Sequence, residues 1–108
     1  SGVNMKENLP TTTSDKVSIY ETTMPLLQAM YDEFKELSKK KPDAAVSKSK
    51  INIANRLLTK IRVVLSDEES IDFLDLLDEE DIPQVSDVTL IFSQYVGVER
   101  AVVSSTAT

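Results

Sequence analysis

The chain has 108 residues, 18 Asp and Glu against 12 Lys and Arg, and a formal net charge of −6. This length is typical of one domain, and the acidic balance disfavours a general binder of nucleic acids or anionic membranes. Cysteine and histidine are both absent, which excludes disulfides, thiolate nucleophiles and metal sites built on either residue. No apolar run approaches the roughly 20 residues that span a bilayer, so we expect a cytoplasmic protein without a membrane segment.

Both ends of the chain are expected to stay outside the folded domain. Residues 1–4, which precede Met5, are typical of a cloning remnant, and residues 5–18 are polar, with Pro10 followed by three threonines. We therefore predict a flexible arm over residues 1–18. Residues 105–108 are expected to fray, which leaves residues 19–104 as a single helical domain.

The first predicted helix begins at Thr22 or Thr23, either of which can cap it, with Pro25 in the first turn. The lysines at 39–41 suit a helix C-terminus, and Pro42 ends the helix. One apolar stripe at helical spacing supports it, made of Met24, Leu26, Leu27, Met30, Tyr31, Phe34 and Leu37.

The second predicted helix begins between Asp43 and Ser49 and ends near Leu65. Its apolar stripe consists of Ile51, Ile53, Ala54, Leu57, Leu58, Ile61, Val64 and Leu65. Its opposite face is polar and basic and carries Lys48, Asn52, Asn55, Arg56, Thr59, Lys60 and Arg62.

A third helix is predicted from Ser66 to about Asp78. Ser66 and Glu69 have the spacing of a capping box, and the acids of residues 78–81 together with Pro83 end the helix. Its apolar residues cover most of the helix circumference, so they must be buried in the core or at an interface. They are Ile71, Phe73, Leu74, Leu76 and Leu77.

A fourth helix is predicted over residues 86–103. The β-branched and aromatic residues of 88–96 would also suit a strand, and Gly97 is a poor helix former, but the helical period favours the helix. Its stripe is Val88, Ile91, Phe92, Tyr95, Val98 and Val102. Four helices with short connections predict an all-α, single, small up-and-down four-helix bundle.

Function is suggested by how the charges are sorted. Nine of the twelve bases lie in residues 35–62, and nine of the eighteen acids lie in residues 67–81, which contain no base. We expect a non-enzymatic, acidic protein-interaction module of the immunity, antitoxin or regulatory type found in bacteria and phages, without metal or cofactor. It would dock a basic protein partner through Asp75, Asp78, Glu79, Glu80 and Asp81. The simpler alternative is that neighbouring helices of opposite charge pair with one another inside the bundle.

Three further alternatives remain. The apolar third helix could form a homodimer interface through Ile71, Phe73, Leu74 and Leu77. The second helix could serve a nucleic-acid-associated regulator, because its side chains are types that contact phosphates and base edges, with Asn52, Asn55, Arg56 and Lys60 as the contact residues. The two acidic tetrads Glu33-x-x-Glu36 and Glu69-x-x-Asp72 resemble the paired acidic motifs of magnesium-dependent nucleotide pyrophosphatases, which implies such an enzyme as the third alternative.

Overall fold

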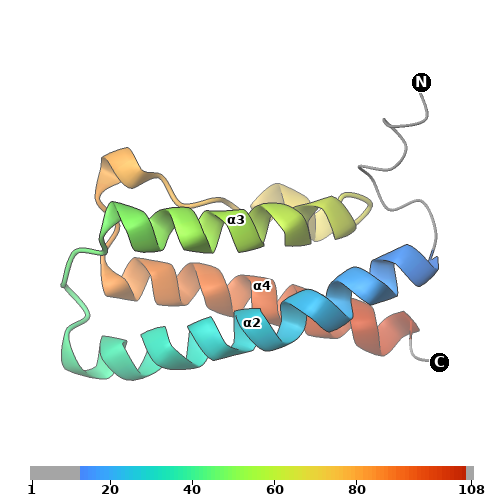
Figure 1. Ribbon diagram of the computed structural model, residues 1–108, viewed down its shortest axis with the longest axis horizontal. Helices are drawn as coiled ribbons and strands as arrows, with labels where there is room; N and C mark the ends of the chain where they lie inside the picture. The colour runs from blue at the N-terminus through green and yellow to red at the C-terminus, as the bar shows by residue number, and fades with distance from the viewer. Residues whose placement is uncertain (1–12, 107–108) are drawn as a thin grey trace.

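The computed structural model describes residues 13–106, and in that range the chain forms three α-helices, so the predicted all-α class is confirmed (Figure 1). The four-helix bundle is wrong, because the predicted third helix does not form. Two short 3₁₀ turns stand in its place. The elements are α2 (Thr13–Lys40), α3 (Lys48–Val64), η1 (Glu69–Phe73), η2 (Glu79–Asp81) and α4 (Val85–Thr106). The predictions for residues 1–12 and 107–108 lie outside the described part of the chain.

Helix α2 begins nine residues before Thr22, so the flexible arm predicted to extend to residue 18 is wrong for residues 13–18. Tyr20 is the reason, since it continues the apolar stripe one turn earlier and is buried. Pro25 therefore lies inside the helix rather than in its first turn. It removes one backbone hydrogen bond, and the Thr22 and Thr23 hydroxyls bond the carbonyls four residues back, at 3.0 and 2.8 Å. Both effects bend helices, and the N-terminal part of α2 is inclined to the rest in Figure 1.

The other two helices lie close to their predicted bounds. Ser47 caps α3, where its hydroxyl accepts a hydrogen bond from the Lys50 N–H at 3.3 Å. Helix α2 ends at Lys40, just before Pro42, as expected. Residues 88–96 lie within α4, so the helical prediction is confirmed over the strand alternative.

The predicted third helix fails at both ends. Ser66 and Glu69 form no capping box, because Glu68 precedes η1 and caps it without a side-chain hydrogen bond. Leu74 and Asp78 have extended backbone angles. A helix with apolar side chains on every side cannot turn all of them toward one core. The irregular chain instead buries Leu74 and Leu77 and leaves Phe73 exposed.

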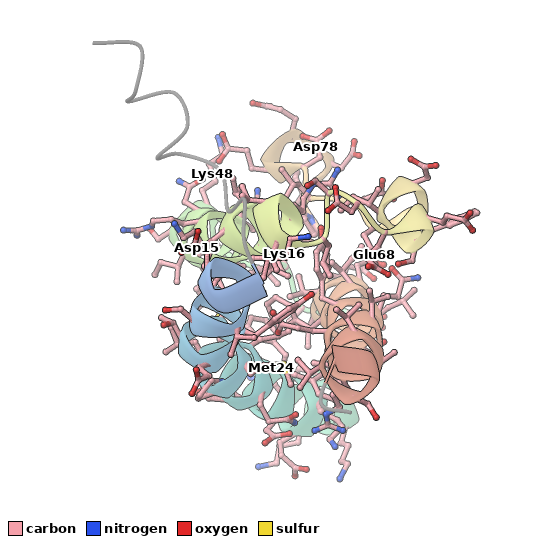
Figure 2. The ribbon with its side chains drawn as sticks, turned by 90° about the vertical axis from the view of Figure 1, so that its right-hand side faces the viewer. Asp15, Lys16, Met24, Lys48, Glu68 and Asp78 are labelled. Carbon is pink, nitrogen blue, oxygen red and sulfur yellow. The ribbon has the colours of Figure 1, made fainter. Side chains whose placement is uncertain are left out.

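Successive elements still alternate in direction, although the third one is not a helix. Residues 65–84 run back along α3, so that α4 points the same way as α3 and opposite to α2 (Figure 1). Seen along the helices in Figure 2, α2, α3, this return segment and α4 surround one core. Within this core Phe34 and Phe92 pack edge to face, with ring centroids 5.4 Å apart. None of the helices in residues 13–106 is long and apolar enough to cross a membrane.

Candidate functional site

The return segment is fixed to α3 by the side-chain amide of Asn55. Its Nδ2 donates a hydrogen bond to the Leu77 carbonyl oxygen at 2.7 Å, and its Oδ1 accepts one from the Leu77 N–H at 2.9 Å. Both polar groups of the Leu77 backbone are thereby satisfied by one side chain. The Leu77 side chain is buried beside this contact, so position 77 is held by packing and by hydrogen bonds together.

Two further side chains hold the same stretch of backbone. Arg62 of α3 donates a hydrogen bond to the Leu74 carbonyl oxygen, and the Tyr95 hydroxyl of α4 donates one to the Asp75 carbonyl oxygen at 3.0 Å. Burial is the main cause that raises the pKa of Tyr95 above its ordinary value. The segment is therefore positioned through its backbone, which leaves its outward side chains free to contact other molecules.

These outward side chains combine apolar groups with carboxylates. In residues 72–82, hereafter the acidic segment, Phe73 is 78% exposed and Ile82 64% exposed, and Leu76 is exposed as well. Six acids lie among them, namely Asp72, Asp75, Asp78, Glu79, Glu80 and Asp81. Ion pairs within the described residues join Lys16 to Asp67 at 2.6 Å and Lys39 to Glu36 at 2.9 Å, and neither uses an acid of this segment.

Ile82 adds backbone strain to its exposure. Its φ angle of 49° places it in the left-handed region, where a β-branched side chain is rarely found. This conformation costs about 1–2 kcal/mol for an ordinary L-residue. The protein thus keeps an apolar, strained residue at the surface, where a polar residue would be better hydrated and Asn or Gly less strained.

The four residues predicted for a homodimer interface do not share one face. Leu74 and Leu77 are buried in the chain's own core, Ile71 is half-buried, and only Phe73 is fully exposed. The helix on which they were expected to lie is absent. The acids predicted to bind a partner are, in contrast, gathered on the acidic segment with Phe73.

The residues predicted for a nucleic-acid face of α3 fall into two groups, one exposed and one turned toward the return segment. Asn52, Arg56 and Lys60 are exposed, so three of the residues predicted for a nucleic-acid face are accessible. Asn55 is instead half-buried, and its amide is turned toward the return segment, where it bonds both backbone groups of Leu77.

The acids proposed for a magnesium site do not assemble one. Glu33 and Glu36 are exposed on α2, and Glu69 and Asp72 are exposed on η1. Residues 13–106 contain no group of three or more His, Cys, Asp or Glu side chains that could hold a metal ion.

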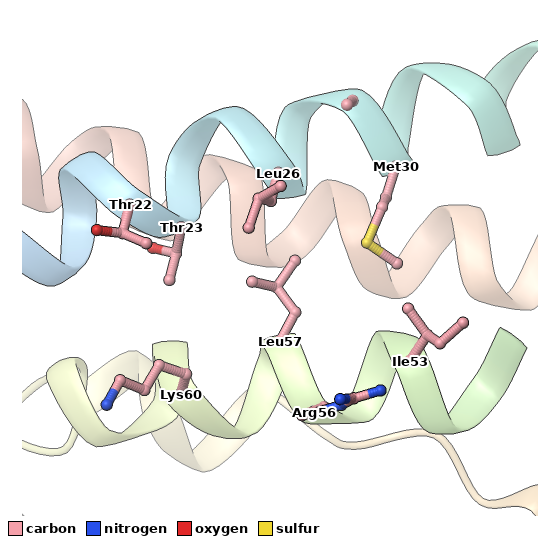
Figure 3. Close-up of a pocket in the computed structure, with 9 residues that line it drawn as sticks. Thr22, Thr23, Leu26, Met30, Ile53, Arg56, Leu57 and Lys60 are labelled. Carbon is pink, nitrogen blue, oxygen red and sulfur yellow. The ribbon is translucent and has the colours of Figure 1, made fainter.

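A second surface, which sequence reasoning did not find, is an apolar groove between α2 and α3 with a volume of about 490 Å³ (Figure 3). Leu26 and Met30 of α2 face Ile53 and Leu57 of α3 across it. Leu26 is 54% exposed and Ile53 52% exposed. Both had been assigned to core stripes, and no sequence signal distinguishes a stripe residue at the centre of the core from one at its edge.

The most unusual buried group is Glu99 of α4, which is fully inaccessible to solvent. Its Oε2 lies 2.9 Å from the Thr23 hydroxyl, and its Oε1 has no hydrogen-bond partner. Loss of solvation is the main cause that raises the pKa of Glu99 from 4.5 to about 7. Burial and the nearby Glu99 and Glu68 carboxylates raise the pKa of Tyr20 to about 12. The spacing of Phe92, Tyr95 and Glu99 places this acid on the apolar stripe, which is the signal that could have revealed it.

No protein-family model, curated protein or solved structure matches the chain. Function is therefore inferred from the surfaces described above.

Proposed function

We propose that the chain is a non-enzymatic protein-interaction module, of the kind that immunity, antitoxin and other small regulatory proteins represent, and that it binds a basic protein partner through the acidic segment. The observation that carries the proposal is the exposure of Phe73 and Ile82 among six carboxylates on a backbone that Asn55, Arg62 and Tyr95 hold in place. An ordered segment loses little conformational entropy on binding, which favours affinity.

The chemistry of this surface describes the partner. An aromatic anchor such as Phe73 favours a pocket at the centre of the interface, where most of the binding energy is concentrated. The surrounding carboxylates favour Lys and Arg at the rim of that pocket, and they accelerate encounter with a basic surface. The strain and exposure of Ile82 fit this role, because both disfavour the free protein and neither is explained by the packing of the chain itself.

The partner can be captured with a photo-reactive phenylalanine analogue at position 73. The matched control carries the same analogue at Leu90, which is 59% exposed on α4 and lies outside the segment. We expect one protein that cross-links from position 73 and not from position 90. Equal cross-linking from both positions would indicate non-specific contacts and would remove the support for a single docking site.

Binding of the purified partner then tests the charges. Asp75→Lys, Asp78→Lys and Glu79→Lys together should weaken binding at least about tenfold, mainly through the association rate, with a steep dependence on salt. The control makes the same change in net charge at exposed acids outside the segment, with Glu21→Lys, Asp32→Lys and Asp43→Lys. Equal losses in the two triple variants would show that only total charge matters, and the acidic segment would not be the site.

One observation favours a second candidate, a nucleic-acid partner on α3. This helix contains Lys48, Lys50, Arg56, Lys60 and Arg62 and no acid. The candidate predicts salt-sensitive binding of DNA or RNA, measured by fluorescence anisotropy, that Arg56→Ala with Lys60→Ala abolishes. Absence of binding at low salt would remove it.

A further inference from the structure

The proposed function leaves the α2/α3 groove, with its volume of about 490 Å³, unused. A second hollow of about 240 Å³ continues it and shares Met30 and Ile53 with it. Together they follow α2 from Thr22 to Leu37, which is about 22 Å at 1.5 Å per residue. An α-helix of about 15 residues has the same length.

We propose that this groove binds an amphipathic α-helix of a partner protein, and that the helix is acidic on the side that faces α3. Four apolar residues line the groove, two from each helix. Leu26 and Met30 lie one helical turn apart on α2, and Ile53 and Leu57 lie one turn apart on α3. Apolar side chains at positions i, i+4 and i+7 of a docked helix would lie between them, as in other helix-in-groove complexes.

The charged residues around the groove indicate that the docked helix carries negative charge. Arg56 and Lys60 line the larger hollow, and Lys50 lines the smaller one together with a single acid, Glu33. Acids outnumber bases in this chain, yet none of these three cations forms an ion pair with any residue of the range 13–106. Carboxylates on the docked helix would provide the partners that the chain itself does not supply.

Two other occupants fit less well. A second copy of the chain would bring another set of Lys50, Arg56 and Lys60 toward the first, and like charges in an interface are unfavourable. A nucleic acid would match the cations, but its phosphates would lie against the exposed apolar floor of Leu26 and Ile53.

The groove and the acidic segment are independent surfaces. At about 100° per residue, Ile53 and Lys60 face the side of α3 opposite to Asn55 and Arg62, which hold the acidic segment. The chain would thus bind an acidic helix on one side of α3 and a basic surface on the other. Changes in the groove leave the acidic segment intact, so that failure of one proposal does not decide the other.

The test uses a displayed library of amphipathic helices of about 15 residues, with fixed leucines and with flanking positions that vary among Glu, Lys and Gln. Selection on the full chain should enrich helices with Glu on one flank. Leu26→Ser with Ile53→Ser should weaken their binding about tenfold or more, whereas Leu90→Ser, at a similarly exposed position outside the groove, should not. Circular dichroism confirms that each variant is folded.

A charge swap gives a result that loss of folding cannot imitate. Arg56→Glu with Lys60→Glu should reverse the selection and enrich helices with Lys on the flank, whereas Lys40→Glu with Lys41→Glu, outside the groove, should leave it unchanged. No enrichment, or the same flank on both proteins, would overturn the proposal. A dimer in sedimentation equilibrium that Ile53→Ser dissociates would assign the groove to a second copy, and nucleic-acid binding lost in the charge swap would assign the cations to phosphate. Either result would also overturn it.

Discussion

Glu99 shares the Thr23 hydroxyl with the Ile19 carbonyl oxygen, in a place from which solvent is excluded. The Thr23 hydroxyl oxygen lies 2.8 Å from the Ile19 carbonyl oxygen and 2.9 Å from Glu99 Oε2, but a hydroxyl has only one hydrogen to donate. If Glu99 is ionised, one of these two acceptors loses its bond. Burial favours the neutral acid and raises its pKa, whereas the hydrogen bond from Thr23 favours the carboxylate and lowers it, and burial is the larger effect.

The resulting dependence of stability on pH has a definite sign. In the unfolded chain Glu99 has an ordinary pKa of 4.5, whereas in the fold its pKa is raised to about 7. Between these two values the folded protein holds a proton that the unfolded chain has released. The free energy of unfolding therefore falls by about 1.4 kcal/mol per pH unit as the pH rises through this interval. The stabilisation is complete below pH 4.5 and lost above about pH 7, a total of about 3 kcal/mol.

Glu99→Gln isolates this effect, because the amide is similar in shape to the neutral acid and does not titrate. Urea unfolding from pH 4.5 to 8 should give similar free energies for both proteins at the acid end, and a variant more stable by up to about 3 kcal/mol at pH 8. Carbon NMR of the Glu99 carboxyl should show a midpoint near 7, and Thr23→Val should move that midpoint higher, because the hydroxyl hydrogen bond lowers the pKa. Parallel stability curves, or a midpoint near 4.5, would refute the reasoning.

Three other substitutions test the fold around the two surfaces. Asn55→Ala leaves the Leu77 backbone groups without partners, so it should cost about 2–3 kcal/mol in urea unfolding and speed amide exchange at Leu77. As a control, Asn52→Ala at an exposed position should change the free energy of unfolding by no more than about 0.5 kcal/mol. Equal losses in the two variants would contradict the role of Asn55. Gly97→Ala should raise the thermal midpoint, since the new methyl group meets no atom within 4 Å and Ala favours a helix by about 0.5–1 kcal/mol; a lower midpoint would contradict this. Ile82→Asn should stabilise the chain by about 1 kcal/mol by relieving its φ angle, yet weaken partner binding; if binding is unchanged, Ile82 is not part of the contact.

The extent to which the sequence predicts this fold differs from helix to helix. Helices α3 and α4 were predicted close to their bounds, because each has an apolar stripe at helical spacing, although the start of α3 was placed only within residues 43–49 and α4 continues to Thr106. For α2 most of the stripe was predicted correctly, with exposed Leu26 as the exception, but Pro25 was taken as a start signal although the helix tolerates it internally. A proline inside a helix and a proline in its first turn have the same local sequence, and only the burial of Tyr20 distinguishes them.

The predicted third helix shows a different limit of prediction from local sequence. Local signals for it were strong, since Ser66 and Glu69 have the spacing of a capping box. Contacts with α3 outweigh these local signals. The hydrogen bonds of Asn55 to Leu77 and of Arg62 to Leu74 use backbone groups that a helix would bond internally, so they require a non-helical backbone there. Those contacts join residues 22 and 12 positions apart, so periodicity within the segment contains no trace of them. Five acids of the candidate site were predicted from the sequence, but the exposure of Phe73 beside them was not, because the sequence predicted a largely buried helix there.

The way α3 holds the return segment explains why the sorted charges do not cancel. The simpler interpretation of the sequence was that bases of the second helix pair with the neighbouring acids inside the fold. Asn55 and Arg62 instead bind backbone groups of the segment, and no ion pair of residues 13–106 joins α3 to it. Attachment through the backbone leaves the carboxylates on one side and Arg56 and Lys60 on the other without an internal counter-charge. Because the two sets lie on opposite sides of α3, an external partner can satisfy one set without disturbing the other.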